Sequence, residues 1–357
     1  MGKTILQIPH RTAPFTCMWN GLEDQYEWKS GIRVPTGSFF FLSGLGEFVY
    51  IKNKRAQVPY QVYWSNGITR NMYMFMKDIV GFNFEMTENR SFAFTLNKAC
   101  QSIDTGIPVI LGALDMFHLP YYEKFYHKIH IPIHYVMMVG YDRDNVYVAD
   151  CGRDDIQTIS CADLERAWDV RIPGFSKRNT MYAVSFSDDI RSFKQIVYSA
   201  LPKKALQWLQ PPVQFIGYPG MVRLIQQFPL WQKQLSFEAY RAVLAAFAEN
   251  TGFPPSVPPK LLAAQGIDST GMPDNYKAAR DLIASTLETL GNWYCEPEWI
   301  AASRLFHESG HLFYNMTDAV TDFLIDPAND LASVPMLLER IAQLEKEAYE
   351  RILSVMG

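Results

Sequence analysis

The stretch from Ile131 to Asp150 constrains this chain more than any other, because it predicts two strands joined by a tight polar turn. β-Branched and aromatic residues fill both runs, and Asp, Arg and Asn fill the turn at 142–145. His134 opens the first strand, and Asp150 closes the second. A hairpin returns the chain to its start, so we expect the imidazole beside the carboxylate, which would hold the ring in one tautomer.

A candidate nucleophile, Cys17, lies near the start of the chain. Apolar residues recur at helical spacing between Met18 and Tyr26, which places Cys17 at a helix N-terminus. Unpaired N–H groups and the helix dipole favour a thiolate there and can bind a developing oxyanion. The alternative is a small buried apolar cysteine, the commoner fate of an isolated thiol. Cys17, His134 and Asp150 are therefore the candidate catalytic residues.

The character of the chain changes near residues 190–215, where Lys and Pro pairs mark a boundary. With 357 residues, two domains are the expectation. The first half places a helix before antiparallel strands, which is typical of an α+β domain at 1–195. The second half predicts an α-helical domain at 196–357. We expect its helices at 220–228, 236–250, 275–294, 297–315 and 331–355.

Composition excludes several classes of protein. The chain has 33 basic and 37 acidic residues and no basic block, so we expect no nucleic-acid partner. No apolar run reaches about 18 residues, so we expect no membrane span. Five cysteines, without CxxC spacing, indicate reduced thiols and a cytoplasmic protein. Gly44 and Gly46 lack the remaining residues of a phosphate loop, and we expect no cofactor.

One motif offers a different chemistry. His307, Glu308 and His311 match the zinc-protease pattern H-E-x-x-H. On a helix the two imidazoles would share a face and bind one Zn²⁺, with Glu308 as the base. A third ligand is not evident, and Gly310 weakens a helix at this turn. We therefore expect a polar helix face here and no metal.

The order of Cys, then His at the head of a strand, then Asp at the end of the next resembles the papain-like C39 peptidase superfamily. More closely, the chain resembles the family of butirosin biosynthesis protein H over most of its length. The residues that carry this resemblance are Cys17 before a helix, the turn at 43–50, Pro108 to Gly112, Leu119-Pro120-Tyr121, the strand from His134 to Asp142, and Val148-Ala149-Asp150.

This resemblance implies a papain-like cysteine-protease fold followed by an α-helical C-terminal domain. Members of the group, among them an amide synthase of closthioamide biosynthesis, transfer an acyl chain from a carrier-protein thioester to an amine without ATP. The implied function is therefore an amide-bond-forming acyltransferase of natural-product biosynthesis with Cys17, His134 and Asp150 as its triad. The implied partners are a phosphopantetheinylated acyl carrier protein and a small-molecule amine. The alternatives are a cysteine peptidase or amidase with the same triad, and a catalytically silent binding module.

Two positions depart from the pattern of the resemblance. Thr16 stands before the cysteine where the family often has histidine. Arg11 stands six residues before the cysteine, where papain-like enzymes often place a glutamine that donates to the oxyanion. The second oxyanion donor therefore does not follow from the sequence.

Overall fold

The computed structural model describes residues 4–13, 17–65, 68–270, 272 and 274–355, without the side chains of residues 18 and 20. Contacts between residues divide the chain into two compact units. The first consists of residues 1–40 and 68–196, and the second of residues 41–67 and 197–357. The limits drawn from the sequence, 1–195 and 196–357, instead placed residues 41–67 in the first domain.

An antiparallel sheet forms the centre of the first unit, with strand order β4-β9-β5-β6-β7-β8 and β1 paired to β6. Its strands are β1 (Thr4–Ile5), β4 (Phe82–Thr87), β5 (Val109–Leu114), β6 (His134–Tyr141), β7 (Asn145–Ala149), β8 (Gln157–Ser160) and β9 (Met181–Phe186). Its helical elements are α1 (Cys17–Ser30), α3 (Thr69–Val80), α4 (Phe92–Asp104), the 3-10 turn η1 (Met116–His118) and α5 (Cys161–Trp168). Helices α2 (Ser38–Ser43) and α6 (Phe193–Leu209) each have residues in both units.

The predicted hairpin is confirmed as β6 and β7. His134 is the first residue of β6, and Asp150 directly follows β7. Met137 pairs with Ala149 in the antiparallel register, so the two strands bring the chain back toward His134. The carboxylate of Asp142 accepts the backbone N–H groups of the turn, including that of Asn145 at 2.9 Å.

Helix α1 begins at Cys17, as predicted, and packs against β6. Gly21 makes this close approach possible, because a Cβ there would lie 3.1 Å from the Cβ of Met137. A larger residue would therefore push the helix away from the strand. The other face of the sheet packs against α4 and α5, with Val136, Met138 and Val148 in one buried apolar cluster. Both faces of β6 are thus covered, and the start of the strand is held in place.

The second unit is mainly helical, as predicted for the C-terminal part of the chain. It contains the hairpin β2 (Leu45–Lys52) and β3 (Tyr60–Ser65), followed by most of α6 and by α7 (Gly217–Gln227), η2 (Phe228–Leu230), α8 (Trp231–Gln234), α9 (Phe237–Glu249), α10 (Pro259–Ala264), α11 (Arg280–Tyr294), α12 (Pro297–Ile325) and α13 (Ser333–Ser354). The long helices α11, α12 and α13 run side by side. Helix α12 continues past the predicted end at 315, through Gly310, where a Cβ would lie 3.2 Å from that of Arg280.

Aromatic packing explains why the β2–β3 hairpin belongs to the second unit. The Trp64 ring lies edge-on to Phe313 with 4.6 Å between centroids, and Tyr60 stacks on Trp231 at 5.4 Å. Arg280 donates to the Trp64 carbonyl at 3.1 Å. These partners lie more than 150 residues away in the sequence, so no local pattern in residues 41–67 indicates them. The sheet of the first unit and the helices of the second unit confirm the predicted α+β class with a helical C-terminal region.

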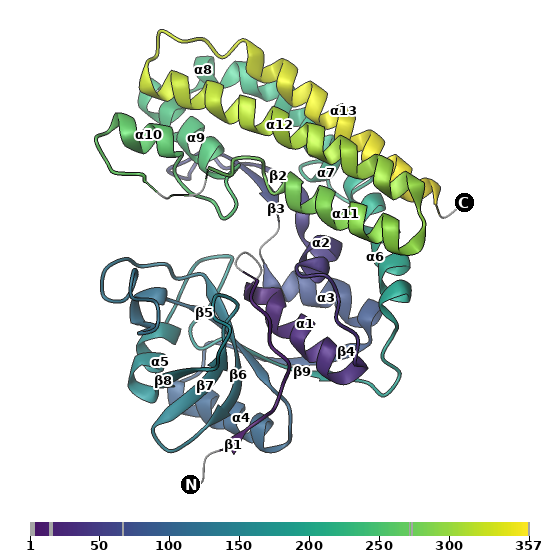
Figure 1. The fold of residues 1–357 in the computed structure, drawn as a ribbon. Helices are drawn as coiled ribbons and strands as arrows, with labels where there is room; N and C mark the ends of the chain where they lie inside the picture. Colours follow the sequence, from purple (N-terminus) through teal and green to yellow (C-terminus); the bar gives the residue numbers. More distant parts are fainter. Residues whose placement is uncertain (1–3, 14–16, 66–67, 271, 273, 356–357) are drawn as a thin grey trace. The chain divides into compact units, whose positions relative to one another are not determined.

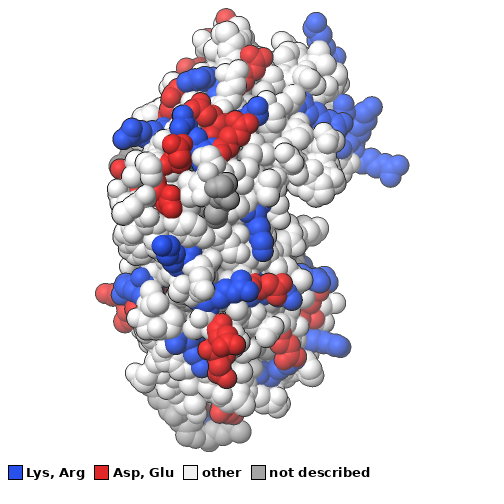
Figure 2. Space-filling model, turned by 90° about the vertical axis from the view of Figure 1, so that its right-hand side faces the viewer, with Lys and Arg blue, Asp and Glu red and all other residues white. Residues whose placement is uncertain are grey.

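On the face drawn in Figure 2, basic and acidic side chains occur in small groups of both signs. Among the described residues, no helix combines the length and the apolar character needed to cross a bilayer.

The ion pair between Arg280 and Glu345 generates a prediction about stability. Both side chains are 0% exposed, and they join through two hydrogen bonds of 2.7 and 2.8 Å. Glu345→Ala leaves a buried guanidinium without its anion, so we expect the free energy of unfolding to fall by about 3–5 kcal/mol. Urea denaturation followed by circular dichroism measures the change.

The matched control is Glu308→Ala, which removes the exposed partner of Arg340. An exposed ion pair contributes less than about 1 kcal/mol, so this variant should unfold close to the parent protein. Equal effects of the two substitutions would contradict the importance assigned to the buried pair.

Candidate active site

The structure brings the three predicted side chains together in the first unit. His134 Nε2 lies 2.7 Å from Asp150 Oδ2, and both side chains are buried. Cys17 lies close enough to His134 for each side chain to shift the pKa of the other. Since Nε2 faces Asp150, Nδ1 is the ring nitrogen left for the sulfur. A thiol, an imidazole and a carboxylate therefore share one site in the first unit.

Two tyrosines hold the Asp150 carboxylate in place. Tyr121 donates to Oδ2 and Tyr122 to Oδ1, both at 2.7 Å. The backbone N–H of Gly152 donates to Oδ1 at 2.9 Å. With His134, four donors surround a carboxylate that is 0% exposed. A buried carboxylate needs such compensation, because an unpaired charge in this environment is strongly unfavourable.

The electrostatics of this cluster favour an ion pair between Cys17 and His134. Burial opposes charge on Asp150, but His134, Gly152 and Tyr122 outweigh it and lower its pKa below the usual range. Burial also opposes charge on His134, yet the charge and hydrogen bond of Asp150 and the contact with Cys17 raise its pKa to about 10. The pKa of Cys17 is well below its ordinary value.

Three donors lower the pKa of Cys17 against the opposing effect of burial. The largest contribution is a hydrogen bond from the neighbouring thiol of Cys151. The hydrogen bond and charge of His134 and the backbone N–H of Tyr135 add to it. These interactions favour the thiolate form of Cys17, which is the nucleophilic form in catalysis by cysteine.

A buried polar network fixes the segment that precedes Cys17. His10 Nδ1 lies 2.8 Å from the Asp24 carboxylate of α1, and its Nε2 lies 2.8 Å from the Arg153 carbonyl and 3.0 Å from that of Asp150. Both nitrogens therefore face acceptors, and although burial opposes it, Asp24 and the two carbonyls raise the pKa of His10. One imidazolium joins the helix of the nucleophile to the loop of the triad carboxylate.

Arg11, the departure from the expected glutamine, belongs to the same network. Its guanidinium is buried, donates to Asp24 at 3.1 Å and to the Val34 carbonyl at 2.6 Å, and forms an ion pair with Glu27. These contacts give Arg11 a structural role in holding α1. Residues 14–16, including Thr16, lie outside the described residues.

Sequence reasoning missed Tyr121, Tyr122, Cys151 and His10 as parts of this site. Tyr121 is one of the residues on which the family resemblance rests, but nothing in its local pattern indicated a contact with Asp150. Cys151 directly follows Asp150, and that adjacency was a usable signal. His10 has no such signal, because its partners lie 14 and 140 or more residues away.

The donor atoms of His134, Asp150 and Cys151 lie within 4.8 Å of one another, a spacing that a metal ion could bridge. The geometry fits a hydrogen-bonded triad better. His134 Nε2 already faces Asp150, and both oxygens of that carboxylate already accept hydrogen bonds from the tyrosines. A metal would have to displace these partners.

The zinc-protease motif lies on the exposed surface of α12. As predicted, its two imidazoles share a face, with 3.2 Å between their Nε2 atoms. Glu308, the residue assigned as base, forms an ion pair with Arg340 at 2.7 Å. His307 Nδ1 lies 3.3 Å from Asp281. Within the described part of the chain, no third His, Cys or acidic residue completes a metal-binding set at this place.

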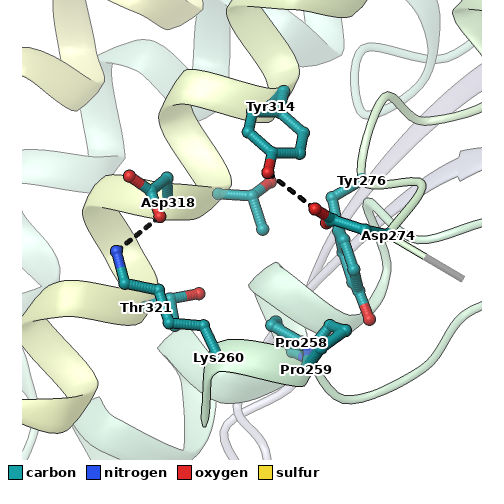
Figure 3. Close-up of a pocket in the computed structure, with 9 residues that line it drawn as sticks. Pro258, Pro259, Lys260, Asp274, Tyr276, Tyr314, Asp318 and Thr321 are labelled. Atoms are coloured by element: carbon teal, nitrogen blue, oxygen red, sulfur yellow. Dashed lines mark hydrogen bonds and ion pairs between the residues drawn. The ribbon is translucent and has the colours of Figure 1, made fainter. Parts of the chain in front are cut away.

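A small cavity of about 80 Å³ in the second unit is lined by Lys260, Asp274, Tyr314 and Asp318 among others. Four of its polar groups form two pairs, as Figure 3 shows: Lys260 with Asp318 at 2.7 Å, and Tyr314 with Asp274 at 2.8 Å. This arrangement fits a self-contained polar patch and lacks the nucleophile and base that the first unit supplies.

Comparison with protein families agrees with this geometry. Residues 16–151, which include the whole triad, match the model of butirosin biosynthesis protein H, N-terminal. This part of the chain is therefore similar to the N-terminal region of butirosin biosynthesis protein H. Residues 162–252 match a second model, a domain of unknown function. The butirosin biosynthesis protein H model thus covers the helix of Cys17, the strand of His134 and the loop of Asp150.

Among solved structures, a protein described as a C39-like peptidase from Bacillus anthracis matches 52% of this chain and all of its own, with 16% identity and a TM-score of 0.36. Similarity at this level carries no assignment by itself. No curated protein matches the chain significantly.

The paired pKa shifts predict an unusual pH profile for Cys17. The sulfur loses its proton as the pH rises through its lowered pKa, and His134 keeps its proton until the pH approaches about 10. Iodoacetamide should therefore alkylate Cys17 faster than an ordinary thiol at pH 6, and the rate should rise less steeply between pH 6 and pH 8, because an ordinary thiol slows about tenfold per pH unit below its pKa. Mass spectrometry of the modified peptides measures the rates.

The exposed Cys295 serves as the internal reference in the same digest. Asp150→Asn removes the anion that raises the pKa of His134, so this variant should lose reactivity at pH 6 first. If the Cys17 rate rose with pH in parallel with that of Cys295, the ion pair would be disproved.

Proposed function

We propose that this protein is an ATP-independent acyltransferase that forms an amide bond in natural-product biosynthesis. It takes an acyl group from the thioester of a phosphopantetheinylated carrier protein, holds it on Cys17, and transfers it to a small-molecule amine. The observation that supports this function best is the preformed ion pair of Cys17 and His134, oriented by Asp150, within the segment that matches the butirosin biosynthesis protein H model.

The first half of the reaction is acyl transfer to the enzyme. The Cys17 thiolate attacks the thioester carbonyl, and the carbon–sulfur bond to the pantetheine breaks. His134, protonated at rest because its pKa is raised to about 10, gives its proton to the departing thiolate. The products are acyl-Cys17, a free pantetheine thiol and a neutral imidazole. Thioester exchange is close to neutral in free energy, so this step needs no activation by ATP.

The second half is aminolysis of acyl-Cys17. The amine attacks the thioester carbonyl, His134 accepts the amine proton, and the Cys17–carbonyl bond breaks to give the amide and the thiolate. Asp150 stabilises the imidazolium that forms and keeps the ring in position, held in turn by Tyr121 and Tyr122. The ion pair of the resting enzyme is restored, and atoms and charge balance over the cycle.

Competition with water distinguishes this function from hydrolysis by the same triad. Water is present at about 55 M, so the amine must gain its advantage from positioning, which can supply large effective concentrations. We therefore expect purified acyl-Cys17 to release amide quickly when a suitable amine is added and to release free acid slowly without it. A single-turnover chase with a panel of primary amines, followed by mass spectrometry, measures both products.

Cys17→Ala is the control for this chase, because it should form no acyl adduct from any acyl thioester. Cys161→Ala is the matched variant, since it removes a thiol of α5 that takes no part in the triad, and it should acylate normally. If free acid formed at the same rate with and without every amine, a peptidase or amidase function would replace the proposed one. If no thioester acylated the parent protein, a silent binding module would be favoured.

Metal removal gives a separate prediction. The proposed cycle uses only the thiolate, the imidazole and the carboxylate, so dialysis against EDTA should leave acylation and aminolysis unchanged. Elemental analysis of the dialysed protein should accompany the assay. If dialysis abolished activity and added Zn²⁺ restored it, the reaction would depend on a metal site, either at the triad or at His307 and His311.

A further inference from the structure

Two neighbouring tyrosines of the connector between η1 and β6 direct their hydroxyls to the same carboxylate. Tyr121 donates to Oδ2 of Asp150 and Tyr122 to Oδ1, both at 2.7 Å. Successive side chains of an extended chain point to opposite sides. Here a turn, closed by the N–H of Tyr122 and the carbonyl of Leu119 at 3.1 Å, leaves the two rings only 4.9 Å apart. One short segment therefore reaches both oxygens of the triad carboxylate.

The two phenols also act on the histidine of the triad. The Tyr122 ring lies edge-on to that of His134, with 5.4 Å between centroids and an angle of 87°, and its hydroxyl oxygen lies 3.5 Å from His134 Nε2. Tyr121 shares Oδ2 of Asp150 with that same nitrogen, which lies 2.7 Å from the oxygen. One phenol thus packs against the imidazole, and the other binds the oxygen that the imidazole uses.

The surroundings of the two phenols hold their hydroxyls in place. A Cβ at Gly152 would lie 2.5 Å from the Tyr122 oxygen, so a larger residue there would displace this hydroxyl. The Arg153 guanidinium lies 4.7 Å from the centre of the Tyr122 ring and donates to the Tyr121 carbonyl at 2.6 Å. A cation over one ring and a hydrogen bond to the backbone of the other therefore keep both phenols against Asp150.

The hydroxyls compete with His134 for the charge of Asp150. Each hydrogen bond that a carboxylate accepts stabilises its charge and so weakens its pull on a neighbouring proton or cation. Without the two phenols, more of this charge would act on His134 Nε2, and the ring would hold its protons more tightly. Burial and Asp150 raise the pKa of both Tyr121 and Tyr122, so the phenols remain neutral donors.

The other titratable groups around the His134 ring come from three segments of the first unit. They are Asp150 and Cys151 after β7, Tyr122 in the connector, and Cys17 at the start of α1. The only charged side chain that contacts the Tyr122 ring among the described residues is Arg153. Of these groups, the phenols can be changed with the smallest effect on shape, because phenylalanine keeps the ring and removes only the hydroxyl.

We propose that Tyr121 and Tyr122 are positioning residues of the acyl-transfer reaction, whose hydroxyls share the charge of Asp150 so that His134 can release its proton and accept one again in each cycle. This inference rests on the proposed function, in which the imidazolium protonates the departing pantetheine thiolate and the neutral imidazole later takes a proton from the amine. A ring that held its proton too tightly would stay protonated in acyl-Cys17 and could not act as the base.

The first experiment titrates His134 directly and needs no substrate. NMR follows the ring signal of His134 in Cys17→Ala protein with ¹³C-labelled histidine. Adding Tyr121→Phe or Tyr122→Phe should raise the midpoint by about 0.5 to 1 pH unit, which is about threefold to tenfold in proton affinity. The matched control is Tyr126→Phe, which removes a hydroxyl of the same connector from a ring stacked on His127 and should leave the midpoint unchanged. An unchanged or lower midpoint in both test variants would overturn the inference.

The second experiment measures the single-turnover aminolysis of acyl-Cys17 between pH 6 and pH 10. In Tyr121→Phe and in Tyr122→Phe, the rising part of the pH profile should shift to higher pH by about the same 0.5 to 1 unit, because His134 must lose its proton to act as the base. The rate at the plateau should stay within about twofold of the parent protein. A rate reduced by one factor at every pH in both variants would indicate a merely structural role and overturn the inference.

Failure of this inference can be distinguished from failure of the proposed function. If no acyl thioester acylated the parent protein, the proposed function would fail and the role in acyl transfer with it, whatever the titration showed. If the parent protein formed amide but neither phenylalanine variant shifted the midpoint of His134, the function would stand. Only the role of Tyr121 and Tyr122 would then be lost.

Discussion

The buried carboxylate of Asp150 is the constraint on which the active site depends. A charge in an apolar interior must be matched by donors, and Tyr121, Tyr122, His134 and a backbone N–H supply them. These donors come from three different parts of the chain, so the need to satisfy one anion fixes a strand start, a connecting loop and a turn together. The orientation of the His134 ring is a result of this arrangement.

The same constraint extends to the nucleophile through the backbone of Asp150. Its carbonyl accepts from the His10 ring, whose other nitrogen faces Asp24 on α1. Helix α1 is therefore placed relative to the Asp150 loop by one imidazole, which faces the Asp24 carboxylate on one side and a backbone carbonyl on the other. Apolar packing of α1 on β6, with Gly21 at the close approach, sets the distance between helix and sheet. The polar contacts of His10 and the apolar packing of α1 on β6 thus both contribute to the position of Cys17.

The local parts of this structure could be predicted from the sequence, and the long-range parts could not. The hairpin of β6 and β7, the start of α1 at Cys17 and the cap of α5 at Ser160 follow from residue periodicity and turn chemistry. The order of Cys17, His134 and Asp150 in the sequence is also what predicts that they form one site. The roles of His10 and the two tyrosines depend on contacts between distant segments, which periodicity does not encode.

The division of the chain into two units also depends on contacts between distant segments, which the sequence does not reveal. Residues 41–67 look like a continuation of the first domain, with alternating aromatic residues suited to a strand. Their place in the second unit depends on Arg280, Phe313 and Trp231, which a reader of the sequence has no reason to connect with Trp64 and Tyr60.

This interleaving means that the chain passes between the two units three times, near residues 40, 67 and 196. A fragment that ends at residue 195 would contain the whole triad, but it would also carry the β2–β3 hairpin with its aromatic side chains stripped of their partners. The remaining helices would lose the strand that Arg280 recognises. The two units are therefore inseparable as continuous pieces of chain, and recombination at a single junction cannot attach a different helical unit to this triad. Any exchange of one unit during evolution would have to carry both of its segments together.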